Sequence, residues 1–105
     1  MTGVLFVYVT CPSTELAQSI GRMAVEKQYA ACANIIPSME SIYRWQGKIE
    51  TARETIMVLK IKEDKWPALC AAIKEAHPYE VPSIVAMPVT HGHAPYLQWV
   101  RDETQ

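Results

Sequence analysis

The feature that most constrains the fold is a long run of alternating side chains between Ala30 and Lys62. A period of two residues is typical of β-strands, in which successive side chains point to opposite faces of a sheet. The run is divided at Gln46-Gly47-Lys48, and a short segment with a central glycine predicts a tight turn. Pro37 and Ser38 interrupt the first half, where we expect a bulge or a bend. The sequence therefore predicts one long β-hairpin.

Strand and helix signals also alternate on either side of the hairpin. Residues 3–10 form a short apolar and aromatic run, which predicts a central strand buried on both faces. A helix is expected from the N-cap Ser13 to about Gln28, and a second helix over residues 66–76 with a proline in its first turn. Residues 83–89 predict a last strand, and residues 95–102 predict a short terminal helix.

This order of elements is βαββαβ with one helix added at the end. Two βαβ units interleaved in one antiparallel sheet give an α+β, ferredoxin-like sandwich with both helices on one face. We expect residues 1–105 to form a single domain of this kind. Tyr43, Trp45, Ile56 and Val58 supply more apolar surface than two helices cover. This excess predicts association with further copies of the chain, by stacking or extension of sheets.

Composition argues against several classes of protein. The 105 residues include 10 basic and 11 acidic side chains, a balance that gives no electrostatic footprint for nucleic acid or an anionic membrane. Residues 51–62 lack the Lys/Arg-Gly-aromatic motif of RNA-recognition domains, which share the same element order. The 3 cysteines have no C-x-x-C spacing, as expected of reduced thiols. With no apolar stretch of membrane length, we expect a soluble, cytoplasmic protein without nucleic-acid or membrane partners.

The chain resembles one known family in three segments that follow in order over almost its whole length. It is similar to the CutA proteins, the divalent-cation tolerance family, in YAACANIIPSMESIYRWQGKIE, HPYEVPSIVAMPVTHG and YLQWV. The resemblance implies a ferredoxin-like fold assembled as a homotrimer, with an architecture similar to the PII-like signalling proteins. It also implies a protein associated with copper and other divalent cations and with tolerance to them, and no established enzymatic reaction.

The stretch His77-Pro78-Tyr79-Glu80-Val81-Pro82 joins the second predicted helix to the last strand. Proline fixes its own φ and moves the preceding residue away from helical geometry, so the stretch forms a rigid link. A neutral imidazole at His77 is suited to bind a metal ion or relay a proton. The helix macrodipole alone also favours a histidine at this helix end. We expect His77 to be the metal-ligating candidate.

Glu54 and Lys60 lie in an apolar strand at a spacing that puts both on one face. A solvated ion pair is one interpretation. The family resemblance implies another, a polar pocket at a cleft between subunits with Tyr79 and Trp45 as its walls. We therefore expect a ligand site composed of Trp45, Glu54, Lys60, His77 and Tyr79.

Cysteines are further candidates because soft copper prefers thiolate ligands. Cys11, at the end of the first strand, is expected to be the most reachable, whereas Cys32 and Cys70 are expected to be packed, structural thiols. His91-Gly92-His93 supplies two imidazoles, fewer than the four ligands of a closed zinc site, and a solvated glycine turn is the alternative.

The chain departs from the family pattern at the described copper sites. Members with such sites carry a cysteine where this chain has Val9, and a His-His pair where it has Ala76-His77. We therefore expect any copper or other divalent cation to bind weakly, with no preference for monovalent copper.

Three functions are compatible with these residues. The leading hypothesis is a trimeric, non-enzymatic protein of divalent-cation (copper) tolerance that binds a metal ion or small ligand at inter-subunit clefts. One alternative is a PII-like small-molecule signalling or scaffold protein, and the other is an acid-base enzyme that uses His77, Glu54 and Lys60. No Ser-His-Asp order, glycine-rich phosphate loop or H-E-x-x-H motif supports the enzyme.

Overall fold

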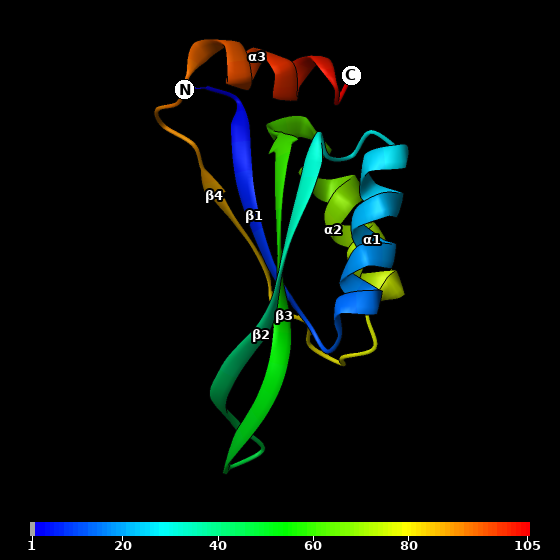
Figure 1. The fold of residues 1–105 in the computed structure, drawn as a ribbon, viewed down its shortest axis with the longest axis vertical. Coiled ribbons are helices and arrows are strands. Elements are labelled where there is room, and N and C mark those ends of the chain that lie inside the picture. The colour runs from blue at the N-terminus through cyan, green and yellow to red at the C-terminus, as the bar shows by residue number, and fades with distance from the viewer. Residues whose placement is uncertain (1) are drawn as a thin grey trace.

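The computed structural model describes residues 2–105 and contains four strands, three α-helices and one short 3-10 helix (Figure 1). The elements follow in the order β1 Val4–Cys11, α1 Thr14–Glu26, β2 Cys32–Trp45, β3 Lys48–Lys62, η1 Glu63–Lys65, α2 Trp66–Ala76, β4 Ile84–Pro88 and α3 Ala94–Asp102. The predicted element order is therefore confirmed, with boundaries that differ by one or two residues.

The four strands form one antiparallel sheet in the order β2-β3-β1-β4. Helices α1 and α2 lie side by side against one face of this sheet, and α3 crosses one end of it (Figure 1). This arrangement is an α+β fold with the split βαβ connectivity of ferredoxin-like proteins. The opposite face of the sheet carries neither α1 nor α2.

The core lies between the sheet and the two helices. From the sheet it takes the fully buried side chains of Val7, Val9, Met57, Leu59 and Ile61, and from the helices Ala17, Ile20, Ala24, Leu69 and Ile73. Strand β1 is central, as predicted, but the prediction that both of its faces are buried is wrong. Phe6, Tyr8 and Thr10 alternate with the core residues and are only partly buried, because α1 and α2 cover the opposite face and α3 packs only on Val4 at the end of this one.

Helix α1 begins and ends for identifiable reasons. Its predicted N-cap is confirmed, since Oγ of Ser13 accepts a hydrogen bond of 3.1 Å from the backbone N–H of Leu16. The helix ends at Glu26, and Gln28 then adopts a left-handed φ of 60°. Gly21 allows the close approach of α1 to β2, because a Cβ at this position would lie 3.0 Å from Cβ of Ala33.

The predicted hairpin and its bulge are confirmed. Trp45 pairs with Lys48 across the turn, and Gln46 and Gly47 have φ values of 50° and 79°, as a two-residue hairpin turn with both central residues left-handed requires. The register shifts between Ile36 and Met39, where Ser38 has a φ of 66°.

One half of the hairpin extends beyond the rest of the sheet. Strand β1 pairs with β3 only from Val4 opposite Lys62 to Cys11 opposite Thr55. Residues 39–54, the hairpin arm, therefore have no third strand beside them and project below the helices in Figure 1. This projection gives the molecule its elongated extents of 44 × 25 × 23 Å.

Candidate functional site

A groove of about 790 Å³ lies between the hairpin arm and residues 77–83, the connector from α2 to β4. The connector passes the end of β1 at the base of the two helices, next to the point where the arm leaves the sheet (Figure 1). Of the five site residues expected from the sequence, Trp45, Glu54 and Tyr79 line this groove. The structure therefore brings three of the five together, from the arm and the connector.

His77 lies behind the groove rather than in it. The residue caps the C-terminal end of α2, and its side chain is only 6% exposed. Its Nε2 lies 2.8 Å from the carbonyl oxygen of Thr10, and its Nδ1 accepts a hydrogen bond of 3.2 Å from the backbone N–H of Tyr79. A carbonyl only accepts, so the proton of this imidazole is on Nε2. Both ring nitrogens are thus occupied, and no lone pair is left for a metal ion in this arrangement.

Glu54 and Tyr79 form a direct contact across the groove. The hydroxyl of Tyr79 donates a hydrogen bond of 2.7 Å to Oε2 of Glu54, whose side chain is only 7% exposed. Burial, and next the hydrogen bond to Glu54, raise the pKa of Tyr79 above its usual value of 10.0. The phenol therefore stays protonated and remains a donor. The ring of Tyr79 also rests on that of His77, with centroids 4.7 Å apart.

Lys60 is not part of this site within one chain. It shares a face of β3 with Glu54, as predicted, but it lies six positions away, or roughly 20 Å at about 3.3 Å per residue. Its Nζ instead donates a hydrogen bond to Oδ1 of Asn34 on β2. The expected site combines Lys60 and Glu54 at a cleft between subunits, and that stays a prediction. Within one chain the two side chains lie apart, because alternation defines a shared face but not a short distance.

The cysteines and the remaining histidines do not assemble a metal centre within one chain. Cys11 is fully buried on the helix-facing side of β1, so the expectation that it is the most reachable thiol is wrong. Burial, and next the charge of Glu54, raise its pKa to about 11. Cys32 and Cys70 are both partly exposed. Across residues 2–105, no group of three or more His, Cys, Asp or Glu side chains is placed to hold a metal ion.

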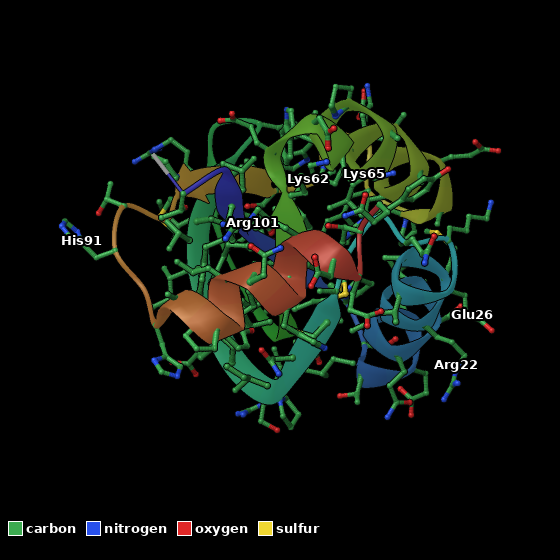
Figure 2. The ribbon with its side chains drawn as sticks, turned by 90° about the horizontal axis from the view of Figure 1, so that it is seen from above. Arg22, Glu26, Lys62, Lys65, His91 and Arg101 are labelled. Carbon is green, nitrogen blue, oxygen red and sulfur yellow. The ribbon has the colours of Figure 1, made fainter. Side chains whose placement is uncertain are left out.

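His91 and His93 remain exposed on the loop before α3. His91 points away from the body of the molecule (Figure 2), and its Nδ1 lies 3.0 Å from the hydroxyl of Thr90. The alternative of a solvated turn fits this pair.

Several groove residues were missed by reasoning from the sequence. Tyr8, Glu40 and Glu80 also line the groove, and Tyr43 was considered only as apolar surface. Alternation along β1 indicates that Tyr8 lies on the sheet face opposite α1 and α2. No pattern in the sequence shows that the arm and the connector enclose a groove, because that depends on where β1 ends relative to β3.

The comparisons with known proteins agree on one family. The family model described as CutA1 divalent ion tolerance protein matches residues 5–103. The chain belongs to the CutA1 family. A solved CutA1 structure, the divalent cation tolerance protein of Thermus thermophilus, superposes with a TM-score of 0.95 at 41% identity and covers 97% of this chain and 99% of its own. The predicted family and the predicted α+β fold are therefore confirmed.

Two further CutA relatives come from distant organisms. Protein CutA of Homo sapiens is 48% identical over 93% of this chain, which spans only 55% of the human protein. The structure titled periplasmic divalent cation tolerance protein CutA of Archaeoglobus fulgidus has a TM-score of 0.94 at 36% identity and covers 97% of this chain and 99% of its own. None of the helices within residues 2–105 combines the length and apolar character that crossing a membrane requires. The cytoplasmic location stays a prediction, since the archaeal relative carries a periplasmic title.

Proposed function

We propose that this CutA1 protein is a non-enzymatic homotrimer that acts in divalent-cation tolerance and binds a metal ion or small ligand in the groove. The neighbouring subunit closes the groove and makes it an inter-subunit cleft. The observation that carries this proposal is an apolar sheet face without a cover. Ile36, Val85 and Met87 point from this face, and their exposed fractions are 51%, 50% and 47%.

An exposed apolar face of this kind favours association. The three residues lie on the two edge strands, β2 and β4, and helices α1 and α2 lie on the opposite face of the sheet (Figure 1). Helix α3 covers one end of the apolar face, where Leu97 and Val100 pack with Val4. Contiguous exposed apolar patches on soluble proteins mark interaction sites. The hairpin arm adds Ile42, Tyr43, Trp45 and Ile49, which are all exposed. Closed rotational symmetry lets the same patches be buried in every copy.

The chemistry of the groove favours a cation as its ligand. Its lining includes the acidic side chains of Glu40, Glu54 and Glu80 and no lysine, arginine or histidine. Copper is the less favoured metal, since His77 is hydrogen-bonded at both nitrogens and Val9 and Ala76 supply no ligand. Glu54 would be one ligand of a bound metal ion, and the neighbouring subunit would supply the others.

Sedimentation equilibrium and calorimetry test this proposal separately. We expect three times the chain mass at low protein concentration, and weak binding of Cu²⁺ by the wild type that Glu54→Gln reduces further. A stable monomer would contradict the trimer. Submicromolar copper binding that survives both Glu54→Gln and His77→Ala would place the metal outside the groove.

The alternatives predict different outcomes. A PII-like signalling or scaffold protein would bind a small molecule or a protein without any response to divalent cations. An acid-base enzyme would use His77 and Lys60 together with Glu54, and both of these groups are hydrogen-bonded elsewhere. We propose no nucleic-acid or membrane partner.

A further inference from the structure

We propose that the groove recognises an organic ammonium ion, with Glu54 as the anionic contact and the aromatic side chains of the arm and connector as walls. This inference names the ligand class of the site in the proposed function. It does not depend on the trimer, because a single chain supplies all the groups that it uses.

The first argument is that Glu54 is an acidic group without a cationic partner. Its carboxyl is almost fully buried at the groove and receives a hydrogen bond only from the neutral hydroxyl of Tyr79. The one salt bridge among residues 2–105 joins Lys62 to Asp64, far along β3 from Glu54. Arg53 is adjacent in sequence, but its side chain alternates to the other side of β3 from Glu54, and no ion pair joins the two. A bound cation would therefore meet an anion that no other charge neutralises.

The second argument is the aromatic lining. Tyr8, Tyr43, Trp45 and Tyr79 all line the groove, and the last three have exposed fractions of 44%, 41% and 37%. Aromatic faces attract ammonium groups through the ring quadrupole, by about 0.5–2 kcal/mol per contact. The same faces accept the apolar body of an organic cation. Aromatic walls next to the buried carboxylate of Glu54 thus match both parts of such a ligand.

The third argument excludes a bare metal ion as the better fit within one chain. Hard divalent cations take six or more oxygen ligands or keep several waters, whereas copper prefers imidazole or thiolate. The groove lies beside His77, whose nitrogens are both bonded, and Cys11, which points into the core. An ammonium group needs one carboxylate and a π-face, and the groove provides both.

A second groove on the same molecule offers a comparison. It measures about 320 Å³ between α1 and β2, and its lining contains Glu26 together with Arg22 and no aromatic side chain. Both of these side chains project from the outer surface of α1 (Figure 2). The carboxylate there has a cation within one helical turn. Glu26 therefore serves as the matched control for Glu54.

Isothermal titration of the protein as purified, with phenethylammonium chloride as the probe, tests the inference. We expect saturable binding of one ion per chain. Neutral 2-phenylethanol, which keeps the ring and replaces the ammonium with a hydroxyl, should bind at least tenfold more weakly. Glu54→Gln keeps an oxygen for the Tyr79 hydrogen bond and should lower the affinity for the ammonium ion at least tenfold. Trp45→Leu, which keeps apolar bulk, should lower this affinity at least threefold.

Three results would overturn the inference. They are equal binding of the alcohol and the amine, unchanged amine binding in Glu54→Gln, or the same loss of binding in Glu26→Gln as in Glu54→Gln. Circular dichroism of each variant shows whether it remains folded. Sedimentation of the same samples separates the two proposals. A trimer that ignores the amine contradicts only the ligand class, and a monomer that binds it contradicts only the assembly.

Discussion

The hydroxyl of Tyr79 donates a hydrogen bond of 2.7 Å to Oε2 of Glu54, and this bond joins the connector to the hairpin arm. The two segments are separated in sequence by the end of β3, η1 and the whole of α2. Their contact therefore fixes the width of the groove. Pro78 and Pro82 restrict the backbone on both sides of Tyr79, so the geometry of the contact is held by the chain itself.

Tyr79→Phe is expected to lower the free energy of unfolding by about 1 kcal/mol, because it leaves a nearly buried carboxylate without its donor. Urea unfolding followed by circular dichroism measures the change. Tyr29→Phe is the control, since the hydroxyl of Tyr29 makes no hydrogen bond within residues 2–105 and its loss should change stability by less than about 0.5 kcal/mol. Equal effects of the two changes would contradict the role of the Glu54 contact.

His77→Ala is expected to destabilise the fold without changing copper affinity. The substitution removes the bonds to the carbonyl of Thr10 and the N–H of Tyr79, each worth about 1 kcal/mol, so unfolding should become easier by about 2 kcal/mol. Since neither ring nitrogen is free, Cu²⁺ binding measured by calorimetry should stay the same. His93→Ala is the matched control, as His93 is exposed and makes no cap bond to α3. Copper binding that is lost in His77→Ala and kept in His93→Ala would show that His77 is a metal ligand.

Stability at alkaline pH is expected to depend on Cys11. Burial, and next Glu54, raise the pKa of this thiol from its usual 9.0 to about 11, so the folded state holds the proton more tightly than the unfolded state. Its contribution is fully present below pH 9 and is lost as pH rises toward 11 and above. The free energy of unfolding of the wild type should fall more steeply over this window than that of Cys11→Ala. Cys70→Ala, which removes a partly exposed thiol, should keep the wild-type slope.

The local elements of this fold follow from the sequence. Period-two alternation, the turn at Gly47 and the bulge near Ser38 depend on neighbouring residues only, and all three are confirmed. The arrangement of the candidate site is predicted less well from the sequence. Glu54 and Lys60 share a face, but their separation depends on their positions along β3. The inaccessibility of Cys11 depends on which face α1 and α2 cover, and a strand pattern alone does not determine that choice.

The groove illustrates the same limit at a larger scale. It exists because β1 ends opposite Thr55 and leaves the hairpin arm without a third strand. That register is set by tertiary packing, so no short motif predicts it. The composition of the groove was in part accessible, since Trp45 and Tyr79 were expected as walls and do line it.

Val85→Glu is expected to disrupt self-association while leaving the monomer fold intact. Val85 lies on β4, on the sheet face opposite α1 and α2, and is half exposed in one chain. A charge there costs little in a monomer but would be buried without a partner in a trimer. Sedimentation equilibrium should show a shift to lower mass, and the melting temperature should fall and become dependent on protein concentration. Val25→Glu places the same charge at an exposed valine of α1, away from this face, and should retain the trimer. A trimer of unchanged mass and melting temperature in Val85→Glu would show that subunits do not meet through this face.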